Sequence, residues 1–351
     1  MKLKIQSSQE NLNQLFLNLK TPQDVATLLE ISFNTLVYHI YKIDPQNRYK
    51  TFSIPKKSGQ TRNISAPITN LKIIQKKLQY ILQQVYLPRS VVHGFVPDRD
   101  IVSNAQIHCK KNYVLNIDLL DFFPSINFGR VRGMFIKPPY NLPPAVATIL
   151  AQICCYNNEL PQGAPTSPII SNMICARMDG ELQRIAGKYR CDYSRYADDI
   201  TFSTSNKSFP NNLCSSLNNV DIIGRELESI IHSNGFQINT NKVRLQHTAN
   251  RQSVTGLITN IFPNTKKKFI KQIRSMLYDW DRYGLMKAQN KLTTKYHNPA
   301  PFKNVLRGKI EFLGMVRGKN DAIYQKYLMA FNKLDPNFIP STAGAAFVPM
   351  A

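Results

Sequence analysis

The stretch Tyr193-Ser-Arg-Tyr196-Ala-Asp198-Asp199-Ile-Thr-Phe202 joins two short β-prone runs at an adjacent pair of acids. Runs of this composition that meet at a short polar break are typical of a β-hairpin, so we expect Asp198 and Asp199 at its tip. A simple polar turn is the alternative. On a chain with 45 Lys and Arg against 22 Asp and Glu, however, two adjacent acids are unfavourable unless a cation lies between them and another acid.

A third acid ends an apolar run further upstream, Tyr113-Val-Leu-Asn-Ile117-Asp118. Hard divalent ions such as Mg²⁺ take carboxylate oxygens as ligands. An acid at a strand end, followed eighty residues later by an acid pair in a hairpin, is the carboxylate arrangement of a two-metal nucleotidyl transferase. We therefore predict that Asp118, Asp198 and Asp199 are catalytic and bind two Mg²⁺ ions, with Mn²⁺ as a substitute.

The motifs around these acids resemble those of a reverse transcriptase. Two of them are Asn116-Ile-Asp-Leu-Leu-Asp-Phe-Phe-Pro-Ser-Ile126 and Leu160-Pro-Gln-Gly-Ala-Pro-Thr-Ser-Pro168. Two shorter motifs, at residues 104–108 and 254–256, narrow the resemblance to bacterial retron reverse transcriptases, over roughly residues 49–334. The resemblance implies an α+β right-hand polymerase with fingers, a palm made of an antiparallel sheet backed by helices, and a helical thumb.

Five segments are expected along the chain. They are an N-terminal helical segment (1–48), fingers (49–115), a palm with the catalytic acids (116–263), a basic helical thumb (264–338) and a disordered tail (339–351). Thr21-Pro22-Gln-Asp24 has the hydroxyl, proline and acid of a helix start. Apolar spacing and flanking residues predict helices over 71–86, 143–156, 168–188 and 222–234. A helix-turn-helix DNA reader near the N-terminus is an alternative to an element that packs or contacts RNA.

The charge of the chain predicts a polyanionic partner. Its formal net charge is +23, and clustered basic residues neutralise phosphates well. No apolar run is long enough to cross a bilayer and no signal peptide is evident, so we expect no membrane partner. Residues 264–335 hold 16 Lys or Arg and 5 Asp or Glu, and aromatic residues are interleaved with them. We expect nucleic-acid contacts there, including Lys267, Lys271 and Arg274; a solvated helical face with core aromatics is the alternative.

The resemblance assigns several residues to the incoming nucleotide. A hairpin is predicted over 49–66, and at its tip Arg62 and Lys56 would bind the triphosphate. Arginine offers phosphate oxygens a planar fork, so lysine would replace Arg62 poorly. Phe123 matches the aromatic gate that excludes a 2′-hydroxyl, and Lys242 matches a lysine that neutralises the leaving pyrophosphate. A core aromatic and an ordinary surface lysine are the respective alternatives.

Other residues are assigned to the nucleic acid itself. Gln162 would bind the sugar or the template strand, and Gly163 and Pro165 would let a backbone approach, unless the motif is only a structural turn. Tyr196 would pack beside the primer terminus. Recognition of a specific RNA element rests on the resemblance alone, and it involves the two short retron-type motifs, with Asn104, His108, Val254, Thr255 and Gly256.

The reaction implied by a retron resemblance begins on a cognate structured non-coding RNA. The enzyme would use dNTPs, prime from an RNA 2′-hydroxyl and leave a branched RNA–DNA product. Phage defence with a separate effector protein, and removal of template by host ribonuclease H, are also implied. Six cysteines without metal-ligand spacing favour a reducing cytoplasm. The alternatives are another defence-associated or group II intron-like reverse transcriptase without branched product, and an RNA-binding scaffold that sequesters a toxin.

Overall fold

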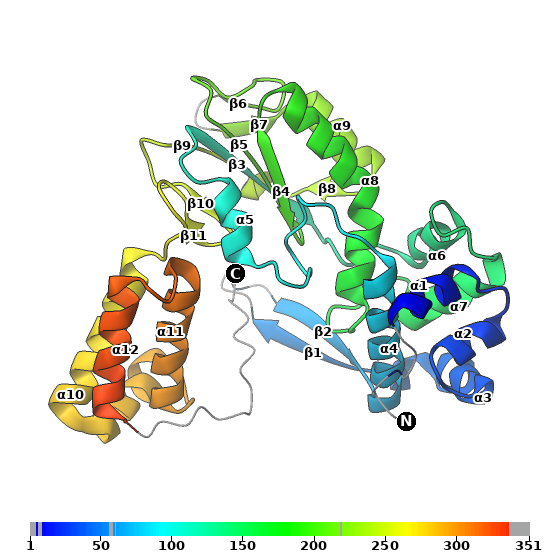
Figure 1. Cartoon of the computed structure of the whole chain (residues 1–351), viewed down its shortest axis with the longest axis horizontal. Coiled ribbons are helices and arrows are strands. Elements are labelled where there is room, and N and C mark those ends of the chain that lie inside the picture. Colours follow the sequence, from blue (N-terminus) through cyan, green and yellow to red (C-terminus); the bar gives the residue numbers. More distant parts are fainter. Residues whose placement is uncertain (1–4, 6–8, 56–58, 60, 218–219, 337–351) are drawn as a thin grey trace. The chain divides into compact units, whose positions relative to one another are not determined.

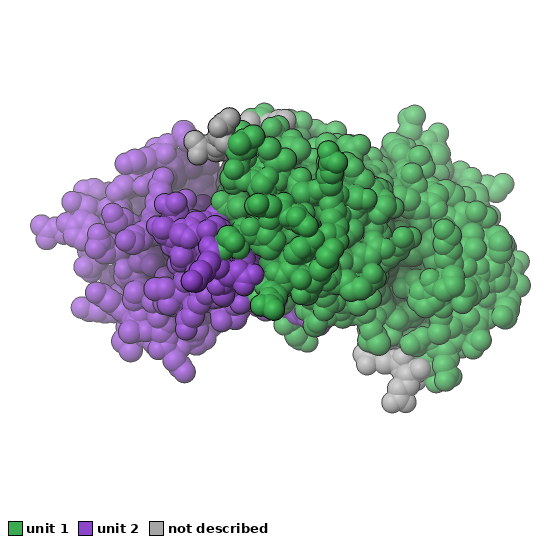
Figure 2. All heavy atoms as spheres, turned by 90° about the horizontal axis from the view of Figure 1, so that it is seen from above, with its two compact units in different colours: residues 1–98, 115–202, 208–245 green, residues 99–114, 203–207, 246–351 purple. Residues whose placement is uncertain are grey.

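A computed structural model describes residue 5 and residues 9–55, 59, 61–217 and 220–336. The chain forms two compact units, which Figure 2 shows in different colours: unit 1 comprises residues 1–98, 115–202 and 208–245, and unit 2 comprises residues 99–114, 203–207 and 246–351. The predicted fingers segment is divided between them at residue 98. The five-segment division stays a prediction, and both Lys56 and the predicted tail at 339–351 lie outside the described residues.

Unit 1 begins with short helices and a hairpin. The helices are α1 (Gln9–Leu17), α2 (Pro22–Leu28) and α3 (Phe33–Val37), followed by a π-helical turn η1 (Tyr38–Lys42) and a 3-10 turn η2 (Pro45–Arg48). The predicted helix start is a capping box, since Thr21 and Asp24 bond each other's backbone N–H. The predicted hairpin is confirmed as antiparallel strands β1 (Tyr49–Pro55) and β2 (Thr61–Pro67), which precede helix α4 (Thr69–Val85).

A five-stranded sheet carries the predicted catalytic acids at the ends of its strands. Its order is β4 (Asp192–Tyr196), β5 (Asp199–Thr204), β3 (Tyr113–Leu120) and β8 (Gln237–Ile238), and β9 (Arg244–His247) also pairs with β3. Strand β5 is buried after its first residue because apolar and small hydroxyl side chains follow the acid pair. The sheet's most central strands, β5 and β3, therefore both carry acids from the predicted catalytic set.

Helices α8 (Ser167–Lys188) and α9 (Arg225–Ser233) back this sheet in unit 1 (Figure 1): α8 packs on β4, and α9 packs on α8 and β8. Helix α6 (Phe128–Ile136) packs on α8 and on α7 (Pro144–Cys154). The helix expected from residue 222 begins only at Arg225. Residues Val220–Ile223 instead form strand β7, which pairs with β6 (Cys214–Leu217). Extended Gly224 separates strand from helix, and a Cβ there would lie 1.9 Å from the Asn212 carbonyl oxygen.

Unit 2 contains helix α5 (Ile101–Ile107), the hairpin β10 (Ser253–Val254) and β11 (Leu257–Ile258), and three long helices. These are α10 (Lys267–Tyr296), which is kinked at Gly284 with a φ of 81°, α11 (Phe302–Arg317) and α12 (Ala322–Leu334), packed around a shared core. Trp280 lies in that core, with its ring near those of Phe302 and Phe331. The sheet backed by helices and the separate helical core confirm the predicted α+β class.

Within the described residues, no helix is long and apolar enough to cross a membrane.

Candidate active site

The acidic turn is pinned to the neighbouring strand. Ala197, between β4 and β5, has a φ of 56°, and this left-handed residue makes the turn tight. The Leu119 backbone N–H donates to the Asp198 carbonyl oxygen at 3.1 Å. Because Leu119 directly follows Asp118 on β3, this bond brings the strand-end acid and the acid pair together, as the sequence predicts.

Burial, together with the charges of neighbouring carboxylates, raises the pKa of two of these acids. Burial, and then the charges of Asp198 and Asp118, raise the pKa of Asp199 to about 7, against opposing effects of Lys242 and Arg244. Burial and the Asp118 charge also raise the pKa of Asp198, with Lys242 and Arg62 acting in the opposite direction. The site therefore favours added positive charge, and Arg62 from β2 lies within electrostatic reach of it.

Lys242 supplies one such charge. It ends a short 3-10 turn after β8, and its Nζ lies 3.0 and 2.9 Å from the two carboxylate oxygens of Asp118. Asn239 holds the same carboxylate, since its Nδ2 donates at 3.1 Å. In the described part of the chain, no three His, Cys, Asp or Glu side chains are already arranged to hold a metal ion. The donor chemistry nevertheless fits divalent ions: three mutually repelling carboxylates, one already paired with a cation.

The predicted gate lies in an aromatic cluster. Phe122 is buried and stacks on Phe236 with a centroid separation of 5.6 Å, while Phe123 is only partly buried. The Phe123 ring lies 6.1 Å from that of Phe95, a partly exposed residue with a φ of 62°. Phe95 was not predicted as a site residue, because no sequence pattern near it indicates that its ring lies beside Phe123.

The glycine-containing turn contacts the predicted fingers hairpin. The carbonyl oxygen of Gln162 accepts from Ser65 N–H on β2 at 2.8 Å. Gly163 has a φ of 119°, and a Cβ there would lie 2.9 Å from the Ile64 side chain. A structural reason for this glycine therefore exists beside the nucleic-acid role, which stays a prediction, as do the roles of Pro165 and Tyr196.

The two retron-type motifs come together in unit 2. Helix α5 packs on β10 and β11, and Thr255 Oγ1 donates to the Ile101 carbonyl oxygen at 3.3 Å. Thr255 and Gly256 have φ values of 45° and 84°, so the motif turns the chain between the two strands. Asn104 and His108 are buried, and His108 Nδ1 lies 2.7 Å from Ser203 Oγ.

Burial changes how these motifs could act. Asn104 lies within α5, and His108 is the residue that caps its C-terminal end. Both side chains point away from solvent and support the module from inside. Val254 is buried as well, which leaves Thr255 and Gly256 at the tip of the turn as its more accessible members.

The residues of the predicted thumb also fall into an exposed group and a buried group. Lys267, Lys271 and Arg274 are exposed at helical spacing on α10, so they share one face. Of the aromatic residues interleaved with these basic ones, Trp280 and Phe302 lie in the core shared by α10, α11 and α12. Tyr278 and Tyr283 are exposed.

A family model described as reverse transcriptase (RNA-dependent DNA polymerase) matches residues 54–315. The Ec86 retron reverse transcriptase of Escherichia coli is 37% identical over 239 residues, covering 67% of this chain and 70% of that protein. The chain belongs to the retron-type reverse transcriptases. The Mx65 retron reverse transcriptase of Myxococcus xanthus is 34% identical over 281 residues, which are 74% of this chain and 62% of that protein. This reverse transcriptase thus spans somewhat under two thirds of the Mx65 relative.

Proposed function

We propose that this chain is an RNA-directed DNA polymerase that extends a primer hydroxyl by nucleotidyl transfer at the acidic turn. The observation that carries the proposal is the bond between Leu119 and Asp198, which joins the strand-end acid to the acid pair. The raised pKa of Asp199 supports it, because a crowded carboxylate site is stabilised by cations. The family to which the chain belongs supports the reaction class.

Asp118, Asp198 and Asp199 would hold the two metal ions. When bound, two divalent ions supply the charge that lowers the primer hydroxyl pKa and neutralises the leaving pyrophosphate. Lys242 would leave Asp118 as the site fills, and its Nζ could then donate to the pyrophosphate. Asn239 would keep Asp118 oriented while this exchange takes place.

The walls of the site would select the nucleotide. Arg62 would bind triphosphate oxygens with its planar guanidinium. Phe123 would stand beneath the sugar and collide with a 2′-hydroxyl, and the contact with Phe95 would keep its ring in place. Gln162 would face the sugar or the template strand. These roles come from the resemblance, and the arrangement of the aromatic cluster supports the gate.

The template would be a cognate structured non-coding RNA. Similarity to the Ec86 and Mx65 retron enzymes supports priming from an RNA 2′-hydroxyl, a branched RNA–DNA product and a role in phage defence with a separate effector protein. The packed module formed by residues 101–107 and 253–258 is our candidate for recognition of that RNA. Host ribonuclease H would remove the copied template, and the reaction would take place in the cytoplasm.

Primer extension tests the reaction class. The full chain, a primed RNA, dNTPs and Mg²⁺ should give DNA, and Asp198→Asn should abolish synthesis while RNA binding remains. Asp192→Asn, which changes an exposed acid at the start of β4, is the matched control and should stay active. RNA binding by a wild-type chain that never extends a primer would favour the scaffold alternative.

Expression with the native flanking DNA tests the finer proposal. Nucleic acid from these cells, treated with ribonuclease, should contain a discrete short DNA whose mobility changes after debranching. A discrete DNA insensitive to debranching would instead favour another defence-associated or intron-like enzyme.

A further inference from the structure

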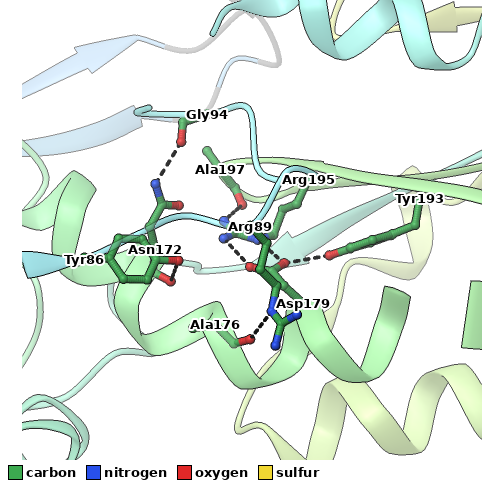
Figure 3. A network of polar contacts seen from close by, with 9 residues as sticks. All are labelled: Tyr86, Arg89, Gly94, Asn172, Ala176, Asp179, Tyr193, Arg195 and Ala197. Carbon is green, nitrogen blue, oxygen red and sulfur yellow. Dashed lines mark hydrogen bonds and ion pairs between the residues drawn. The ribbon is translucent and has the colours of Figure 1, made fainter. Parts of the chain in front are cut away.

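A buried ion pair lies behind the acidic turn, and none of the roles above uses it. Asp179 on α8 and Arg195 on β4 have no exposed side-chain surface. Arg195 Nε lies 2.7 Å from one oxygen of Asp179, and Nη2 lies 2.8 Å from the other. The Tyr193 hydroxyl donates to the first oxygen at 2.7 Å (Figure 3). The carboxylate is thus held by two neighbours from β4.

The guanidinium also reaches the turn itself. Arg195 Nη1 donates to the Ala197 carbonyl oxygen at 3.0 Å (Figure 3). Ala197 is the left-handed residue of the turn, a conformation that is strained for an L-residue other than glycine. Its carbonyl carbon is bonded to the nitrogen of Asp198. The hydrogen bond therefore acts on the peptide unit that sets the direction of the first acid.

The loop at residues 91–94 packs against the other side of the acidic turn. Arg195 N–H donates to the Val91 carbonyl oxygen at 2.9 Å, and His93 N–H donates to the Arg195 carbonyl oxygen at 2.8 Å. A Cβ on Gly94 would lie only 2.4 Å from the Ala197 nitrogen. Asn172 Nδ2 on α8 donates to the Gly94 carbonyl oxygen at 2.9 Å. The backbone of the turn is therefore packed between this loop and the buried guanidinium.

Arg195 keeps its positive charge despite its burial. Burial by itself lowers the pKa of Arg195, but the charge of Asp179 raises it, and the result is a pKa well above the usual range. Desolvation of two charges largely offsets their attraction, so a buried ion pair is a weak source of stability compared with apolar residues of similar volume. Its geometry offers another reason for its presence: one planar fork bonds a helix carboxylate and the turn carbonyl at once.

We propose that Arg195, held by Asp179, is a positioning residue for nucleotidyl transfer. It fixes the Ala197 carbonyl and thereby the placement of Asp198 and Asp199. The proposal rests on the proposed polymerase function. Lysine would retain the charge and could pair with Asp179, but its single ammonium cannot reproduce the fork that also reaches the Ala197 carbonyl.

The decisive variant is the double substitution Arg195→Met/Asp179→Leu in the full chain. It replaces the ion pair by apolar side chains, so no unpaired buried charge remains, but the bond to Ala197 is lost and the Tyr193 hydroxyl loses its acceptor. We expect the chain to stay folded, with a thermal midpoint lowered only by the loss of these hydrogen bonds. In primer extension, kcat should fall about 100-fold, as expected for a misplaced catalytic group, while the KM for dNTP stays unchanged.

Two further variants keep the test interpretable. Lys77→Met removes another buried cation, one that donates to the carbonyl oxygens of Leu29 and Glu30, and should leave kcat unchanged. Arg195→Lys carries the test if the double variant does not fold, and it should also lose kcat. A folded Arg195 variant with wild-type kcat would overturn the positioning role, whereas an inactive wild type would overturn the polymerase proposal instead.

Discussion

Asp199 shows at the scale of one residue how much stability is lost when a carboxylate is buried beside two others. Its pKa of about 7 lies above the ordinary value of 3.8, so between these two pH values the folded chain binds more protons here than the unfolded chain. Stability therefore falls as the pH rises through this interval and stays low above it. The arrangement is tolerable at neutral pH because cations such as Lys242 offset the repulsion.

Substitution of Asp199 should expose this cost. Without divalent ions, Asp199→Asn should raise the free energy of unfolding at pH 8 by about 1–2 kcal/mol after allowance for solvent screening, and change it little at pH 4. Thermal unfolding at both pH values, with EDTA present, measures the difference. Asp121→Asn, an exposed acid after β3, is the control. Equal effects of Asp199→Asn at both pH values would contradict a raised pKa of Asp199 caused by burial and repulsion.

The aromatic gate gives a second prediction at this scale. Phe123→Ala should allow ribonucleotide incorporation, raising the ratio of rNTP to dNTP kcat/KM at least about tenfold, because the colliding ring is gone. Primer extension with single nucleotides measures the ratio. Phe95→Leu should give a smaller change in the same direction, since it only removes the neighbour at 6.1 Å. An unchanged ratio of rNTP to dNTP use in Phe123→Ala would contradict the gate and leave this ring with a packing role only.

At the scale of elements, the exposed basic face of α10 can be changed by substitution without disturbing the apolar face that packs in the core. Lys267→Ala/Lys271→Ala removes two exposed cations while leaving Ile273 and Leu277 packed. If both lysines contact phosphates, the slope of log binding constant against log salt concentration should decrease by about 2. Filter binding of RNA across a salt series gives this slope. Lys326→Ala/Lys333→Ala on α12 makes the same change in net charge, and an equal effect would indicate only non-specific attraction.

Elements were predictable where the deciding interactions are local. The Thr21–Asp24 helix start, the two hairpins and helix α8 follow from residues a few positions apart, and the structure confirms them. The late start of α9 was missed, because pairing of β7 with β6 overrides its helical apolar spacing. The ion pair between Asp179 and Arg195 was also missed, since no local pattern links a helix acid to a strand arginine.

At the scale of the whole molecule, the acids and the retron-type motifs lie in different compact units. The acids belong to unit 1, and so do the parts of β3, β4 and β5 that lie next to them. Asn104, His108 and the 254–256 turn belong to unit 2. Sequence spacing placed the acids together correctly because both strand ends border one sheet. It could not show that two motifs about 150 residues apart form one module, since that contact depends on the packing of α5 against β10 and β11.

This division predicts that template choice and chemistry can be separated. Gly256 has a φ of 84°, so Gly256→Ala should strain the turn by about 1 kcal/mol and displace its tip, although nothing lies within 4 Å of the added Cβ. The variant should keep extension of a generic primed RNA, which depends on the acids. It should lose the discrete DNA made from the cognate RNA in cells carrying the native flanking sequence. Asp198→Asn, by contrast, should lose both. If Gly256→Ala and Thr255→Ala both make that DNA at the wild-type level, the 254–256 turn is a structural hairpin and recognition of the cognate RNA lies elsewhere in the chain.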